Sequence, residues 1–136
     1  MSFIEWNPSL DVPHEKINEQ HHTLVEAVNR LHEAVTSGAP DKSLTDLLLF
    51  LTNYVGQHFA DEEDLMKSVD YPHYEEHRDI HRKLFLQVQA RTGALIRGEA
   101  VDGPELLEFL KTWLTDHILG TDAEMAKFVT DALGAR

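Results

Sequence analysis

Residues 44–65 read LTDLLLFLTNYVGQHFADEEDL, and this stretch decides the fold. Every third or fourth residue suits a core position, with the spacings alternating as on an α-helix that has one inward seam. These seam positions are Leu44, Leu48, Leu51, Val55, His58, Glu62 and Leu65. Residues four apart lie about 40° apart around a helix axis, so His58 and Glu62 share one face. Two ionisable side chains therefore take core positions in an otherwise apolar seam.

Three other segments carry the same alternation, and each brings a histidine into its seam. The first seam is Ile17, His21, Leu24, Val28, Leu31 and Val35, whereas His22 lies off it. The third is Tyr74, His77, His81, Leu84 and Val88, and the fourth is Leu106, Leu110, Trp113 and His117. Glu63 lies off the second seam. The pattern predicts four amphipathic helices that direct polar side chains into one interior.

Prolines and glycines divide the chain into these helices. Pro13, Pro72 and Pro104 each come just before helical pattern and suit the first helical position, and Gly38 and Gly98 suit the residue after a helix. The predicted helices span residues 13–37, 41–66, 72–97, 104–119 and, shorter, 121–133. Residues 1–12 form an arm without clear periodicity, and no segment alternates as a strand would. The predicted fold class is all-α, an up-down-up-down antiparallel four-helix bundle with an N-terminal arm and a short C-terminal helix.

Length and charge exclude several classes of function. We expect one domain over residues 1–136. The chain has 12 basic and 24 acidic residues, for a formal net charge of −12, which disfavours nucleic acid and anionic membranes as partners. It contains no cysteine, so disulfides, thiolate metal sites and iron–sulfur clusters are excluded. Residues 1–6 lack a signal-peptide pattern, and the apolar run 47–51 is too short to cross a bilayer, so we expect a cytoplasmic protein without membrane insertion.

Asp122 interrupts the seam of the last segment. It follows His117 by five residues, about 140° around a regular helix, yet Met125, Val129 and Ala132 then continue the seam from Asp122. One residue has in effect been inserted. We predict a π-bulge around residues 119–121, with Gly120 easing the backbone, because such bulges accommodate one extra residue and are frequent at functional sites. Alternatively, the fourth helix ends at Gly120 and Asp122 caps the next helix. Either arrangement leaves a carboxylate close to His117.

Seven inward-facing ligand candidates result: His21, His58, Glu62, His77, His81, His117 and Asp122. Burying imidazoles and carboxylates without partners costs several kcal/mol each. Coordination to metal cations is the simplest compensation, because the cations balance the carboxylate charge and use the imidazole lone pairs. The sequence therefore predicts a buried metal site.

The motifs Ile17–Leu24, His58–Met66, Tyr71–His81 and Trp113–Asp122 resemble those of the hemerythrins, specifically the single-domain bacteriohemerythrins. The resemblance implies a non-haem centre of two iron ions (Fe2+/Fe3+) with a bridging oxo or hydroxo group. It assigns His77, His81 and His117 to one iron, His21 and His58 to the other, and Glu62 and Asp122 to both as bridges. Coordination counting under this assignment leaves one position open, on the iron with only two histidines.

The same resemblance implies reversible dioxygen binding, for storage or for delivery to an oxygen-consuming enzyme, by a protein that is not itself an enzyme. It implies an apolar dioxygen pocket formed by Leu24, Phe59, Trp113 and Ile118. The donor balance fits this function, since the ferritin-like di-iron sites use four glutamates and two histidines. A site richer in neutral nitrogen should stabilise ferric iron less and favour return to the ferrous pair. We expect a monomer.

Other functions remain open at this point. A di-iron redox enzyme with peroxidase, oxidase or nitric oxide chemistry would reveal itself by sustained turnover, and a sensor would report oxygen or iron to a partner. His73-Tyr-Glu-Glu-His77 also matches a short zinc-peptidase pattern, which leaves the other ligand candidates unexplained. Leu24, Phe59 and Trp113 sit at core spacing and could be plain core. His14, His22 and His32 are expected at the surface.

Overall fold

The protein is an antiparallel four-helix bundle, which confirms the predicted fold class. The computed structural model describes residues 3–6, 8–100 and 102–134; the side chains of residues 9, 118 and 119 lie outside this description. Its elements are η1 (Pro8–Leu10), α1 (Glu15–Thr36), α2 (Asp41–Ser68), α3 (Tyr74–Ile96), α4 (Gly103–His117), η2 (Ile118–Asp122) and α5 (Ala123–Gly134). No strand occurs in the described part of the chain. Within the same residues, no helix has both the length and the apolar character needed to cross a bilayer.

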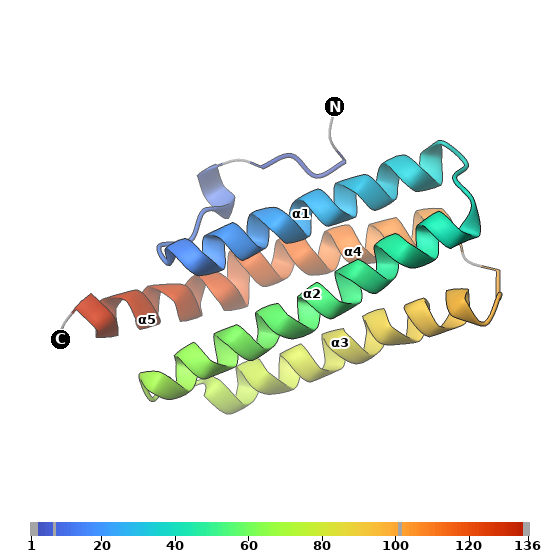
Figure 1. Cartoon of the computed structure of the whole chain (residues 1–136). Coiled ribbons are helices and arrows are strands. Elements are labelled where there is room, and N and C mark those ends of the chain that lie inside the picture. Colours follow the sequence, from blue (N-terminus) through green and yellow to red (C-terminus); the bar gives the residue numbers. More distant parts are fainter. Residues whose placement is uncertain (1–2, 7, 101, 135–136) are drawn as a thin grey trace.

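Successive helices run in opposite directions, and α2 packs against both α1 and α3 (Figure 1). Helix α4 returns beside α1 and continues through η2 into α5 along nearly the same line (Figure 1). The start of α1, the end of α2, the start of α3 and the end of α4 therefore meet at one end of the bundle. Six of the seven predicted ligand residues lie in these four segments, and Asp122 lies in η2, directly after α4.

The helix starts differ from two of the proline-based predictions. Helix α1 begins at Glu15, and its N-cap is His14, whose Nδ1 accepts a hydrogen bond from the backbone N–H of Ile17 at 3.3 Å. Helix α3 begins at Tyr74, after His73. The predictions for Pro13 and Pro72 were therefore wrong: the fixed φ of proline also suits the turn before a helix, and here a histidine separates each proline from the first helical residue. Pro104 is the second residue of α4.

Two glycines end helices as predicted. Gly38 follows α1 with φ of 72°, and Gly98 follows α3 with φ of 79°. These are left-handed backbone conformations, which glycine adopts without the steric cost that a Cβ atom would impose. Both positions confirm the sequence-based ends of the two helices to within about two residues.

A buried polar layer separates two apolar clusters of the core. The larger cluster fills most of the bundle and includes Leu24, Phe59 and Trp113. The smaller cluster closes the other side, near the end of the bundle, and includes Ile17 and Met66. In α1 the order Ile17, His21, Leu24 passes from the small cluster through the polar layer into the large one. The histidines and carboxylates are therefore enclosed by hydrocarbon along the bundle axis.

The N-terminal arm packs on the outer face of α1. Asn29 holds it through two hydrogen bonds to the backbone of Ile4, at 2.7 and 2.9 Å. The rings of Trp6 and His22 stack with centroids 3.5 Å apart. His22 is exposed, as its position off the seam predicted, and its ring contact is with the arm and not with the interior.

Candidate metal centre

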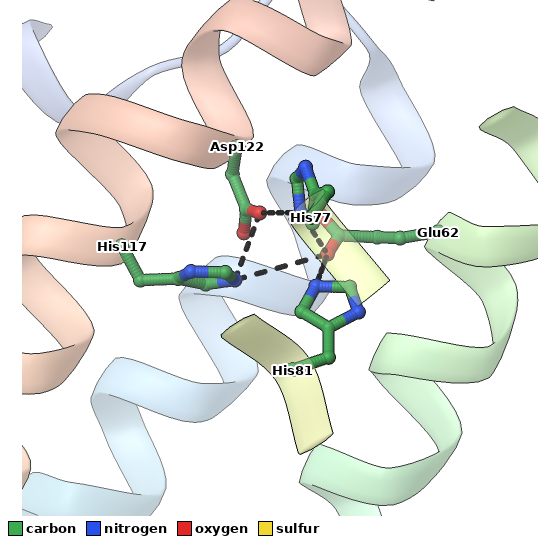
Figure 2. Close-up of side chains that lie close together, drawn as sticks. All are labelled: Glu62, His77, His81, His117 and Asp122. Atoms are coloured by element: carbon green, nitrogen blue, oxygen red, sulfur yellow. Dashed lines mark hydrogen bonds and ion pairs between the residues drawn. The ribbon is translucent and has the colours of Figure 1, made fainter. Parts of the chain in front are cut away.

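The structure brings all seven predicted ligand residues into one buried layer. Each is at most 4% exposed, and together they come from α1, α2, α3, α4 and η2. The histidines turn Nε2 inward, toward the oxygens of Glu62 and Asp122. Figure 2 shows five of the residues around a common centre: Glu62, His77, His81, His117 and Asp122. The ligand atoms form two sets, and within each set all atoms lie within 4.8 Å of one another. Both sets include the two carboxylates.

The first set contains His77, His81 and His117, and is called the three-histidine group below. His117 Nε2 lies 2.8 Å and His77 Nε2 lies 3.1 Å from Oδ1 of Asp122. His81 Nε2 lies 2.9 Å from Oε1 of Glu62. The three imidazoles come from two helices, with His77 and His81 one turn apart on α3, and they face one oxygen of each carboxylate.

The second set, the two-histidine group, contains His21 and His58. Their Nε2 atoms lie 2.7 and 3.4 Å from Oδ2 of Asp122. They lie 4.0 and 3.5 Å from Oε2 of Glu62. The two groups therefore use different oxygens of the same carboxylates: Oδ1 and Oε1 face three histidines, and Oδ2 and Oε2 face two. Each carboxylate could therefore coordinate a cation held by either histidine group.

Unpaired polar atoms in the layer fit a bound metal. Both carboxylate oxygens of Glu62, Nε2 of His81 and Nε2 of His117 are buried without a hydrogen-bond partner in the described residues. The 2.9 Å approach of His81 to Glu62 is thus close but not aligned for a hydrogen bond. An unpaired buried polar group costs about 1–3 kcal/mol, so such a cluster is costly unless a ligand satisfies it. Imidazole and carboxylate donors suit first-row transition metals such as iron, zinc and manganese.

The outward nitrogens of two histidines have side-chain partners that sequence reasoning missed. His58 Nδ1–H donates to Oε1 of Gln20 at 2.7 Å, and His81 Nδ1–H donates to Oε2 of Glu63 at 3.1 Å. A donating Nδ1–H leaves the Nε2 lone pair free for a metal. Gln20 and Glu63 are the immediate chain neighbours of His21 and Glu62, and this adjacency was the one signal available in the sequence.

The mutual charges of the layer shift several pKa values. Burial alone would lower the pKa of His117, but the charge of Asp122 and contacts with both carboxylates raise it to about 10. Burial also opposes the protonation of His58 and His77, and the same carboxylates outweigh it and raise the pKa of each. Burial would raise the pKa of Asp122, whereas His117 and the other nearby histidines hold it well below its usual range. In the metal-free protein, protons thus provide the positive charge that a metal would otherwise supply.

Asp122 reaches the layer because the helix is interrupted as predicted. Residues Ile118–Asp122 form one turn of π-helix between α4 and α5. Hydrogen bonding from residue i to i+5 brings Asp122 back over His117, although a regular helix would point it elsewhere. The suggested contribution of Gly120 is not required by space or conformation, since a Cβ atom there would meet no heavy atom within 4 Å and its φ is not positive.

Three of the four predicted pocket side chains lie against this layer or in the core beside it. Phe59 stacks on His81 with ring centroids 3.9 Å apart, and it also contacts His58 at 5.8 Å, so it touches both histidine groups. Trp113 meets Phe59 edge to face at 6.3 Å. Leu24 is buried in the same cluster, one helical turn from His21. The side chain of Ile118 lies outside the described residues.

Comparison with known proteins agrees with this geometry. Residues 12–129 match the family model described as the hemerythrin HHE cation binding domain. The chain belongs to the hemerythrin family, whose domain binds metal cations.

Similar proteins span most of the chain. Bacteriohemerythrin of Pseudomonas aeruginosa is 32% identical over 123 residues, which cover 90% of this chain and 79% of that protein. A hemerythrin-like protein of Naegleria gruberi is 32% identical over 119 residues, covering 88% of this chain and 87% of that protein. The crystal structure of a wild-type hemerythrin superposes with a TM-score of 0.88 at 25% identity, over 94% of this chain and 98% of that one.

Proposed function

We propose that the protein holds two iron ions and binds dioxygen reversibly, for storage or for delivery to an oxygen-consuming enzyme. His77, His81 and His117 would hold one ion, His21 and His58 would hold the other, and Glu62 and Asp122 would bridge them. When bound, the iron pair would supply an open coordination position for dioxygen and two electrons for its reversible reduction.

One observation carries this proposal: each carboxylate directs one oxygen toward the three-histidine group and the other oxygen toward the two-histidine group. Oδ1 of Asp122 lies near His77 and His117, and Oδ2 lies near His21 and His58. Two bridging carboxylates and a shared oxygen bridge would give both six-coordinate ions the same number of ligands. The five imidazoles, however, divide as three at one ion and two at the other. The two-histidine position is the one left incomplete, so it is where a small ligand would bind.

The surroundings of the layer favour binding over turnover. The two apolar clusters enclose the layer along the bundle axis, so hydrocarbon limits the access of water and anions. Exclusion of water suppresses proton delivery and hydrolytic side reactions at a buried site. Phe59 supports this by stacking flat on His81, which covers one face of that imidazole and restrains its rotation.

The test begins with the purified protein loaded with ferrous iron without oxygen. We expect two irons per chain and a visible spectrum that changes in air and returns under vacuum over repeated cycles. Glu62→Gln, which keeps the size but removes a carboxylate from both positions, is the matched control and should lose the cycling. A protein that binds fewer than two irons, or whose colour does not return under vacuum, would contradict the proposal. Continued oxygen consumption with an added reductant would assign it to the di-iron redox enzymes instead.

A further inference from the structure

The two histidine groups differ in the charge that their outward nitrogens meet. His81, in the three-histidine group, donates its Nδ1–H to the carboxylate of Glu63. His58, in the two-histidine group, donates to the neutral amide of Gln20. The outward nitrogens of the remaining three, His21, His77 and His117, are buried without a hydrogen-bond partner in the described residues. In each group, one histidine thus has a side-chain partner at its outward nitrogen. Of these two partners, Glu63 is an anion and Gln20 is neutral.

Within the described residues, the only hydrogen bond or ion pair of the Glu63 side chain is with His81. Within the described residues, Glu63 forms no ion pair with a lysine or arginine, and its side chain is 24% exposed. Arg78 and Arg82 line the same groove of about 370 Å³ between α2 and α3, but neither lies within ion-pair distance of Glu63. The Glu63 carboxylate therefore contacts the imidazole directly, whereas the two arginines lie beyond ion-pair distance in the described structure.

The corresponding negative charge at the two-histidine group is displaced outward and paired. The amide of Gln20 donates through Nε2 to Oδ2 of Asp61 at 2.7 Å. Asp61 also accepts from Gln57 at 2.9 Å and lies 3.7 Å from Lys16 Nζ. The amide orientation is fixed by these contacts, because Gln20 must present its oxygen to His58 and its nitrogen to Asp61. At its outward nitrogen, His58 thus meets a neutral acceptor, and the carboxylate of Asp61 lies one side chain further away.

A hydrogen bond from Nδ1–H to an anion makes an imidazole a more basic ligand, because negative charge is pushed toward the ring as the N–H bond polarises. A more basic ligand favours the higher oxidation state of the metal that it holds. Hydrogen bonds of this outer kind, together with burial, are the means by which proteins adjust the potentials of metal centres.

We infer that Glu63 is a positioning residue that makes the iron of the three-histidine group the more easily oxidised of the two. The inference rests on the proposed function, since it requires iron at both positions. One equivalent of ferricyanide would then take its electron from the iron held by His77, His81 and His117. The iron at the two-histidine position, which is open to a ligand, would stay ferrous. Glu63 and Gln20 thereby determine the order in which the two positions lose electrons.

Isosteric substitutions test the inference in the iron-loaded full chain. Glu63→Gln keeps an oxygen acceptor for His81 and removes the charge. Gln20→Glu adds a charge beside His58 and is combined with Asp61→Asn, because Oδ2 of Asp61 lies 2.7 Å from Nε2 of Gln20 and would otherwise face a second carboxylate. We expect Glu63→Gln to weaken the preference for ferric iron about tenfold, which raises the potential of the first oxidation by about 59 mV. Asp64→Asn is the matched control, because it removes one charge from the adjacent exposed residue and should shift the potential much less.

The combined variant Glu63→Gln/Gln20→Glu/Asp61→Asn exchanges the two outer partners, and Asp64→Asn remains its control because both remove one negative charge in total. In the half-oxidised protein, azide serves as the probe, because this anion binds ferric iron at an open position more tightly than ferrous iron. We expect the combined variant to bind azide about tenfold more tightly than the parent, measured by the visible absorption of the ferric–azide complex. Melting of the metal-free variants checks that the bundle is intact.

The outcomes separate this inference from the function on which it rests. Variants that hold two irons and cycle with dioxygen, but keep the parent potential and azide affinity, would overturn the inference alone. A shift of the potential in Asp64→Asn as large as that in Glu63→Gln would also overturn it. The loss of any nearby negative charge would then explain the shift without the hydrogen bond to His81. A parent chain that does not hold two irons would overturn both the inference and the proposed function.

Discussion

Truncation of Leu24 tests whether this side chain protects the iron pair from autoxidation without contributing to iron or dioxygen binding. Leu24 is 1% exposed in the large core cluster, three residues after His21, so Leu24→Ala removes methyl groups next to the polar layer. Substitutions of this kind cost about 2–5 kcal/mol when the cavity cannot collapse. For a chain of this length, that corresponds to a melting temperature lower by roughly 8–20 °C. We expect two irons per chain and normal initial dioxygen binding, because no ligand is altered. Autoxidation should accelerate about tenfold, a barrier lower by roughly 1.4 kcal/mol, as water enters.

Leu31→Ala is the matched control for this prediction. Leu31 is on the same helix and equally buried, but it lies about 10 Å further from His21 and lines a cavity at the opposite end of the bundle with Leu48 and Leu95. Its truncation should cost a similar stability without faster autoxidation. The assay follows the visible spectrum of the oxygenated protein over time, with added azide and at lower pH to increase the difference. Equal decay in the parent and Leu24→Ala would show that Leu24 is plain core, and equal acceleration in Leu31→Ala would attribute the effect to general loosening.

Three further measurements test the metal centre. His21→Ala should lose iron at the two-histidine position, whereas His22→Ala should keep both irons because His22 is exposed and stacks on the arm. The reverse pattern in iron analysis would contradict the orientation of α1. Glu62→Ala and Asp122→Ala should each lower the occupancy of both positions, and two magnetically coupled irons in either variant would exclude that residue as a bridge. Metal removal should lower the melting temperature, and this decrease should grow from pH 6.5 to about 10. The reason is that the raised pKa of His117 stabilises the metal-free fold fully below pH 6.5, and this stabilisation is lost as the group deprotonates toward pH 10. A decrease that does not grow with pH would refute this.

The bundle could be predicted from sequence because each helix has one continuous seam. Burial of positions such as Val28, Val55 and Leu110 depends on spacing alone, and all three are fully buried. The starts of α1 and α3 were less predictable, since proline is compatible with both the first helical turn and the preceding connection. At α1 the decision depended on His14, whose ring nitrogen accepts the backbone N–H of Ile17.

The members of the polar layer could also be predicted, because ionisable residues at core positions violate the seam pattern and need a compensating partner. Gln20 and Glu63 carried no such signal. Half-buried polar residues at the border of a helix interface are common, and their contacts depend on how far each helix is rotated about its own axis. That rotation brings Gln20 toward His58 and Glu63 toward His81, and seam spacing does not specify it to the accuracy of a hydrogen bond.

The π-turn shows why one inserted residue matters to the chemistry of the layer. On a regular helix, the residue that shares a face with His117 one turn later is Thr121, whose neutral hydroxyl offers one oxygen where a carboxylate offers two oxygens and a negative charge. The turn Ile118–Asp122 instead brings the next residue, Asp122, to that place. Its two oxygens then face different groups, Oδ1 lying 2.8 Å from His117 and Oδ2 lying 2.7 Å from His21. The insertion thus lets this segment place His117 in one histidine group and the Asp122 carboxylate between both groups. Met125 and Val129 then rejoin the apolar seam and close the layer.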